Sequence, residues 1–187
     1  MEVLGLNIEC LERSRGYFME KSQFLFRVIR QEEAEQAVGI EAICFPPHEA
    51  CSRESMLARI AKAPELFLVA EDRQTGKIAG FLNGIATNEQ VFRDEFFTDA
   101  DLHEPNGSNI MILGLDVLPE YRCQGLAREL MRRYLCIGKE KGRKTVVLTC
   151  LDDKVKMYQK MGFHDRGLAN STWGGEQWHE MRHTLDL

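Results

Sequence analysis

The chain has 187 residues, of which 44% are hydrophobic and 28% are charged, and this composition is typical of a globular domain with one sizeable core. Its net charge of -5 at pH 7 gives no general affinity for nucleic acid or for an anionic membrane surface. No apolar run approaches the roughly 18 residues of a membrane-spanning helix, and the first residues lack the pattern of a secretory signal. We therefore expect a cytoplasmic protein that binds neither nucleic acid nor membrane.

The hydrophobic pattern predicts an N-terminal extension of unknown role at 1–23, where no period is visible, and a single domain at 24–187. In chain order, the expected elements are a strand at 24–30, helices at 31–45 and 52–63, strands at 65–72 and 77–87, a long loop at 88–108, a strand at 110–118, a helix at 124–141, a strand at 144–150, a short helix at 153–161, and closing strands at 163–168 and 177–185. This order predicts a mixed α/β sheet with helices on both faces.

Six cysteines are scattered singly through this pattern. None belongs to a CxxC pair or stands at zinc-ligand spacing with a histidine: Cys10, Cys44, Cys51, Cys123, Cys136 and Cys150. Single cysteines in a chain with no secretory signal indicate free thiols in a reducing compartment. We expect neither disulfides nor a metal site.

The segment 109–131, NIMILGLDVLPEYRCQGLARELM, passes from an apolar strand into a helical pattern. A helix N-terminus leaves its first N–H groups unpaired and carries partial positive charge, which suits a phosphate. Gly125 lets the backbone approach a ligand closely, and Arg122 and Arg128 flank the unpaired groups. No lysine and Ser/Thr follow the glycine, so the segment is not a nucleotide P-loop. Taken alone, it also fits an ordinary strand-to-helix turn.

The segment GLDVLPEYRCQGLARELM resembles the acetyl-CoA signature of the GCN5-related N-acetyltransferase (GNAT) superfamily, and VVLTCLDDKVKMYQKMGFH resembles its later strand and helix. Together they are most similar to the arylalkylamine N-acetyltransferase branch, while IEAICFPPHEA and PELFLVAED fit more loosely. The resemblance spans 24–185. It implies a mixed, mostly antiparallel central sheet with helices on both faces, in which two strands splay apart to bind acetyl-CoA as cosubstrate.

The resemblance also implies where acetyl-CoA binds. The pantetheine arm would pair with the backbone of the strand before the loop, and the pyrophosphate would lie on N–H groups of the loop and first helical turn. The matching positions are Leu115, Asp116, Val117, Arg122, Cys123, Gln124, Gly125, Leu126, Ala127 and Arg128. Gly114 stands where a bulge would turn the strand. The side chain of Asp116 is expected to turn away from the polyanion, as a cap or in a salt bridge.

The implied chemistry is direct attack of a neutral amine on the acetyl thioester, which needs an oxyanion donor and a proton for the departing thiolate. Tyr158 matches the family tyrosine beside the sulfur and would act as the general acid, since a phenol is protonated at neutral pH. The backbone N–H near Leu115 would stabilise the oxyanion. The alternative for Tyr158 is simple packing under a short helix.

The general base departs from the branch pattern, because Met111 and Leu113 stand where serotonin-acetylating relatives carry two histidines. Neither side chain can move a proton. His48 and Glu49, in a loop that walls the amine pocket in this family, are candidates for substrate contact and for the base. Further candidates are Glu41 and Glu89, or a water chain with no dedicated base. The histidines expected to be structural or exposed are His164, His179 and His183.

The substrate pocket is expected to form from residues 44–52, the loop 88–108 and the closing turn at 170–178. The aromatic side chains there would receive an apolar or aromatic amine: Phe92, Phe96, Phe97 and Trp173. The acidic ones would instead attract a polyamine: Asp94, Glu95, Asp99 and Asp101. The alternative is that the acids only keep the loop soluble.

The expected function is therefore acetyl transfer from acetyl-CoA to a primary amine, such as a small arylalkylamine or a polyamine. Two alternatives remain open. One is acetylation of protein N-termini or lysines, and the other is a catalytically weak module that binds acyl-CoA. The expected assembly is a monomer or a homodimer.

Overall fold

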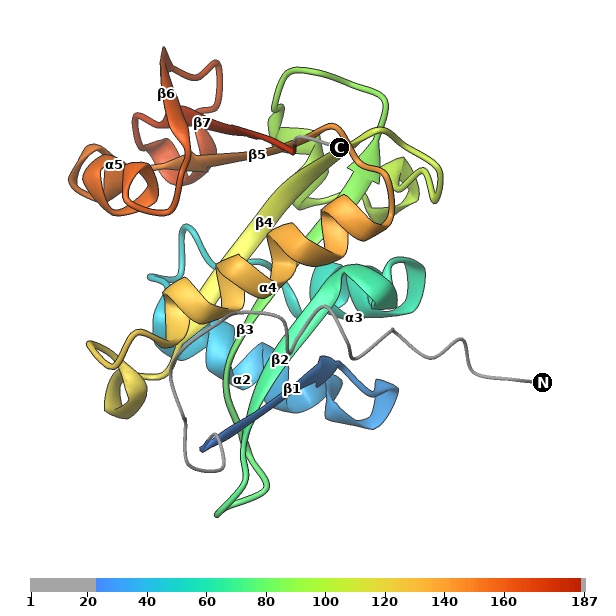
Figure 1. The fold of residues 1–187 in the computed structure, drawn as a ribbon, viewed down its shortest axis with the longest axis vertical. Coiled ribbons are helices and arrows are strands. Elements are labelled where there is room, and N and C mark those ends of the chain that lie inside the picture. The colour runs from blue at the N-terminus through green and yellow to red at the C-terminus, as the bar shows by residue number, and fades with distance from the viewer. Residues whose placement is uncertain (1–22, 186–187) are drawn as a thin grey trace.

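The computed structural model describes residues 23–185 (Figure 1). All but the last residue of the predicted N-terminal extension lies outside this range. The main elements, in chain order, are β1 (Phe24–Val28), α2 (Ala34–Cys44), α3 (Arg53–Lys62), β2 (Phe67–Asp72), β3 (Ile78–Thr87), β4 (Asn109–Val117), α4 (Leu126–Glu140), β5 (Thr145–Cys150), α5 (Asp152–Gln159), β6 (His164–Leu168) and β7 (His179–Thr184). This order is the one that the sequence predicts. None of the helices within residues 23–185 is long and apolar enough to cross a membrane.

The strands form one seven-stranded sheet in the order β1-β2-β3-β4-β5-β7-β6. Every neighbouring pair is antiparallel except β4 and β5, which are parallel. The predicted mixed, mostly antiparallel sheet is therefore confirmed. The parallel pairing of β4 with β5 stops after Met111, although β4 continues to Val117. Figure 1 shows the two strands diverging beyond this point.

Helices cover both faces of the sheet, because α4 packs on one face and α2 with α3 on the other (Figure 1). The long amphipathic α4 buries a stripe of side chains at helical spacing against β2, β3 and β4. Successive residues from Phe67 to Ala70 of β2 alternate between the two cores, as the pleat of a strand requires. The sheet is thus buried on both sides around the diverging strands.

Local sequence signals set the helix ends. The Ser52 hydroxyl accepts a hydrogen bond from the Ser55 N–H at 3.1 Å, so the predicted N-cap of α3 is confirmed. The helix predicted from residue 124 begins at Leu126 instead. The reason is Gly125, whose φ of +82° is left-handed and cannot belong to a right-handed helix.

The loop 88–108 contains two short 3-10 helices, at Asp94–Phe97 and Ala100–Leu102. Phe92 and Phe96 are fully buried in the core on the α4 side, with ring centroids 5.7 Å apart. The expectation that these two rings receive the amine is therefore wrong. They instead anchor the loop to the sheet by apolar burial.

Candidate active site

The edge of β4 that faces β5 is open from Ile112 to Val117, because β5 pairs only with residues 109–111. On its other side, β4 stays paired with β3 as far as Val117. Asn83 pairs with Gly114 and Gly84 pairs with Ile112, so the bulge falls at Leu113, beside the expected position. Backbone groups on the open edge have no partner strand, and they can pair with an extended ligand.

The loop after β4 places an exposed helix N-terminus at the end of this open edge. Arg122, Cys123, Gln124 and Gly125 are all exposed, and a Cβ at Gly125 would meet no atom within 4 Å. Cys123 has a φ of +60°, so two residues of this short loop are left-handed. The Nε of Arg122 donates to the carbonyl of Val117 at 2.9 Å, which fixes the loop to the strand. Open space above unpaired N–H groups suits a phosphate.

Tyr158 lies on α5, which follows β5 on the far side of the strand opening. Its side chain is buried, and its ring contacts Phe163 edge-on at 5.9 Å between centroids. Burial is the main cause that raises the pKa of Tyr158 above its ordinary value, and the charges of Cys150 and Asp116 add to it. The phenol is therefore protonated at neutral pH, as a proton donor must be.

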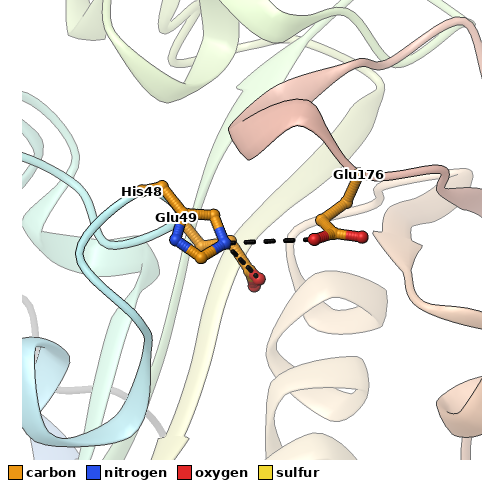
Figure 2. Close-up of side chains that lie close together, drawn as sticks. All are labelled: His48, Glu49 and Glu176. Atoms are coloured by element: carbon orange, nitrogen blue, oxygen red, sulfur yellow. Dashed lines mark ion pairs between the residues drawn. The ribbon is translucent and has the colours of Figure 1, made fainter.

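His48 and Glu49 lie in the α2–α3 loop, where Glu176 approaches them from the turn before β7 (Figure 2). The Nε2 of His48 lies 3.5 Å from Glu49 Oε1 and 3.9 Å from Glu176 Oε1. Within residues 23–185 this is the group of three side chains whose ligand atoms, all within 4.8 Å of one another, could hold a metal ion. His48 and Glu176 are exposed, and exposed acidic groups are common without an ion.

The closing turn at 170–178 contacts the α2–α3 loop and the loop 88–108. The Nε1 of Trp173 donates to the carbonyl of Glu49 at 2.8 Å, and its ring lies 4.9 Å from that of Phe97. The backbone N–H of Thr172 donates to Asp94 at 3.0 Å. The three segments expected to wall the pocket thus lie together, with His48 and Glu49 on their surface.

The other candidate bases and histidines have partners elsewhere. Glu89 forms an ion pair with Arg93 at 2.7 Å, which lowers the pKa of the carboxyl and makes it a weak base. His179 contacts Asp165 at 3.1 Å, and His183 contacts the carbonyl of Gly162 at 2.7 Å. These two histidines have structural contacts in the closing strands, as expected. Met111 and Leu113 are buried in the core, and their side chains supply no proton acceptor, as the sequence predicts.

A buried polar cluster lies on the α2 and α3 side of the bulge. Asp116 is 0% exposed, and neither of its carboxylate oxygens has a hydrogen-bond partner among residues 23–185. The expectation that it acts as a cap or in a salt bridge is therefore wrong. Its neighbours are Glu41, Arg59 and Asn83, all buried. Burial and the charge of Glu41 raise the pKa of Asp116 well above its ordinary value, while Arg59 opposes this.

The sequence contains a signal for this cluster, of which only Glu41 was expected to be a candidate base. Glu41 sits among apolar residues on the buried side of α2, and Arg59 stands between Met56 and Ile60 on the buried side of α3. Asp116 interrupts an apolar strand in the same way. A charged residue at a core position of an amphipathic element indicates a buried partner or a functional site.

We expect Asp116→Asn to raise the free energy of unfolding by about 1–3 kcal/mol at neutral pH, because an amide here carries no charge to desolvate. The pKa of Asp116 is raised in the folded state. The wild type therefore compares best with the variant in free energy of unfolding at pH values below about 4, the pKa in the unfolded state. It loses that stability as the pH rises towards the folded pKa. Urea unfolding of both proteins between pH 4 and pH 8 measures the difference, and a difference that is constant with pH would contradict the assignment.

Comparison with known proteins assigns the chain to a family. The sequence model described as "Acetyltransferase (GNAT) family" matches residues 29–163. Serotonin N-acetyltransferase of Mesocricetus auratus is 29% identical over 113 residues, which are 60% of this chain and 53% of that protein. The chain therefore spans about half the length of this curated relative.

Solved structures share the fold at low identity. A GphF GNAT-like decarboxylase in complex with isobutyryl-CoA has a TM-score of 0.74 and 19% identity, over 87% of this chain and 100% of that one. The loading GNATL domain of CurA from Lyngbya majuscula has a TM-score of 0.74 and 16% identity, over 87% and 98%. YncA, a putative acetyltransferase from Salmonella typhimurium with acetyl-CoA, has a TM-score of 0.63 and 16% identity, over 89% and 96%.

The family match runs from the end of β1 through β4, the exposed loop and α5, so it includes every element of the strand opening. The sheet order and the solved structures agree with it. The chain belongs to the acetyltransferase (GNAT) family.

Proposed function

We propose that the protein transfers the acetyl group of acetyl-CoA directly to a primary amine of a small molecule, an arylalkylamine or a polyamine, and that residues 24–187 form one catalytic domain. The observation that carries the proposal is the open edge of β4, which ends at the exposed N-terminus of α4 and faces α5 with Tyr158. The 29% identity to serotonin N-acetyltransferase supports an amine as the acceptor.

The residues of the opening fit acetyl-CoA. The backbone of Leu115, Asp116 and Val117 would pair with the amides of the pantetheine arm along the open edge. The N–H groups from Cys123 to Arg128 would hold the pyrophosphate, since they lie at a helix N-terminus that the exposed residues Cys123 to Gly125 precede. When bound, acetyl-CoA supplies an acetyl carbon whose thioester bond breaks as the new amide forms.

The protein's contribution to the chemistry is to place an oxyanion donor and an acid. The backbone N–H near Leu115 lies beside the bulge and would stabilise the negative charge that develops on the carbonyl oxygen. The hydroxyl of Tyr158 would then give its proton to the departing thiolate. Its raised pKa keeps this proton in place at neutral pH.

The acceptor would enter between the α2–α3 loop and the closing turn. Glu49 and Glu176 place carboxylates there beside His48, and such a group attracts an ammonium by its charge (Figure 2). Phe97 and Trp173 stack next to this entrance and offer an apolar wall. The combination suits an amine with a short apolar or aliphatic body.

Thiol release tests the proposal directly. Purified protein with acetyl-CoA is expected to release CoA in the presence of at least one arylalkylamine or polyamine, and to release little with peptides that carry a free N-terminus or lysine. A thiol-detecting reagent measures the rate, and mass spectrometry identifies the acetylated amine. Turnover of peptides alone would favour protein acetylation. Acetyl-CoA binding by calorimetry without turnover of any acceptor would favour an acyl-CoA-binding module.

A further inference from the structure

The buried polar cluster of Glu41, Arg59, Asn83 and Asp116 is only partly hydrogen-bonded: Glu41 accepts from the N–H of Cys51, and Arg59 donates to Asn83 and to the carbonyl of Phe97. Within the part of the chain that the structure describes, five of its side-chain atoms have no hydrogen-bond partner: Glu41 Oε2, Arg59 Nε, Asn83 Nδ2, and both carboxylate oxygens of Asp116. The four side chains are between 0% and 4% exposed. Buried polar groups are normally satisfied, because each unmet one costs free energy. A cluster with this many unpaired polar atoms in the core of an enzyme indicates a functional site.

The atoms without hydrogen-bond partners lie around one point of β4. A Cβ at Gly114 would lie 2.9 Å from Asn83 Nδ2, 3.1 Å from Asp116 Oδ2 and 3.6 Å from Glu41 Oε2. Only glycine leaves this point free. Gly114 follows the bulge at Leu113, where β4 has already parted from β5, and it precedes Leu115, the proposed oxyanion donor. Gly114 is next to Leu115 in β4, so the cluster borders the segment where the acetyl group is expected to bind.

The two carboxyl groups cannot both be ionised at low cost. They lie beside the same point in the core, away from water, and the charge of Glu41 adds to burial in raising the pKa of Asp116. With one proton between them and the guanidinium of Arg59 beside them, the cluster is neutral overall. The shared proton would also provide the donor that the oxygens of Asp116 lack.

The groups that face Asp116 come from every neighbouring element. The titratable and charged ones are Glu41 and Cys44 on α2, Cys51 in the loop after it, Arg59 on α3 and Tyr158 on α5. Burial raises the pKa of the Cys44 thiol to about 11 and that of the Cys51 thiol to about 12, so both stay neutral. Because these neighbours do not accept a proton near neutral pH, the carboxyl pair is the proton-accepting group of the cluster.

We propose that Glu41 and Asp116 act as one carboxyl pair that accepts the proton of the acceptor ammonium before its nitrogen attacks the acetyl carbon. The inference rests on the proposed function. One N–H bond of the ammonium breaks and one O–H bond forms on the carboxylate that the singly protonated pair still has, so both carboxyls are neutral until this second proton passes to solvent. The neutral nitrogen attacks, the C–S bond breaks, and the thiolate takes the proton of Tyr158. The second proton lost by the nitrogen then restores the phenol.

Burial makes this proton transfer easier than it is in water. An ammonium and a carboxylate become two neutral groups, and desolvation favours the neutral form of each. The guanidinium of Arg59 further disfavours a second cation nearby. The pair would therefore replace the strand histidines whose positions are taken by Met111 and Leu113.

The shared proton is testable without any substrate. Infrared spectra at about pH 7 are expected to show the carbonyl band of a protonated carboxylic acid in the wild type, and to lose it in both Asp116→Asn and Glu41→Gln. Glu140→Gln, at an exposed position near the end of α4, is the control and should keep the band. Absence of the band from the wild type would overturn the inference.

The proton-accepting role is testable through the pH profile of turnover. At about pH 7 each variant is expected to lose roughly 100-fold in kcat/KM for the amine, and the double variant to lose little more. The deficit should shrink about tenfold per pH unit as the free amine becomes abundant, while calorimetry shows unchanged acetyl-CoA affinity. If the loss of kcat/KM in folded variants stays constant with pH, the pair has a purely structural role. That result would overturn this inference and leave the proposed function intact. No turnover of any amine by the wild type would overturn the proposed function and the inference together.

Discussion

Gly125→Glu is expected to weaken acetyl-CoA binding by at least about 100-fold. Two effects combine at this position. The φ of +82° favours glycine, so a glutamate would distort the loop that presents the N–H groups. Its carboxylate would also stand where the pyrophosphate binds, and like charges at close range repel each other. Isothermal titration calorimetry with acetyl-CoA measures the loss.

A matched control separates the site from the backbone strain. Gly142, after the end of α4, has a φ of +67° and no atom within 4 Å of the position of a Cβ, as does Gly125. Gly142→Glu should therefore cost similar stability and leave acetyl-CoA affinity intact. Equal affinities for Gly125→Glu and the wild type would mean that the pyrophosphate does not lie on this loop.

Tyr158→Phe is expected to lower kcat by about 100-fold, with little change in acetyl-CoA affinity. The variant removes the proton that the thiolate needs and keeps the ring that packs on Phe163. Because burial raises the pKa of Tyr158, the phenol stays protonated over the working range. The wild-type rate should therefore not fall between about pH 7 and pH 9 through loss of this proton. Steady-state kinetics on the amine identified by the thiol assay provide the measurement.

The control for this prediction is a second buried tyrosine. The hydroxyl of Tyr134 on α4 donates to the carbonyl of Leu66 at 3.0 Å, in the core. Tyr134→Phe should lower the free energy of unfolding by about 1 kcal/mol and leave kcat unchanged. If Tyr158→Phe behaves like this control, Tyr158 serves only in packing.

The parts of the fold that depend on nearby residues could be predicted from the sequence. Ser52 caps α3 because its partner is three residues away, and Pro64 follows the end of that helix. The order of strands and helices, and the open loop at Gly125, likewise follow from short patterns. The left-handed conformation of Gly125 was not predicted, because the pattern placed this residue inside the helix, and its proposed role depends on the family resemblance.

The parts that failed depend on contacts between distant segments. Glu41 and Asp116 are 75 positions apart in the sequence, and only the packing of α2 on β4 brings them to the same point. Phe92 and Phe96 appeared to belong to a substrate loop, but burial in the core decides their position. Hydrophobic periodicity gives the buried side of an element and not the residue opposite, so pairings across elements could not be predicted.

The short pairing between β4 and β5 has a consequence for how the protein unfolds. Three residue pairs, from Asn109 to Met111 on β4, provide the sheet pairing between β1–β4 and β5–β7. A ligand lying along the open edge would connect the two halves as an additional strand does. Its binding energy would then stabilise the contact between these two parts of the sheet. Acetyl-CoA would in this way act as a structural component of the C-terminal third of the protein, and the cooperativity of unfolding would depend on its concentration.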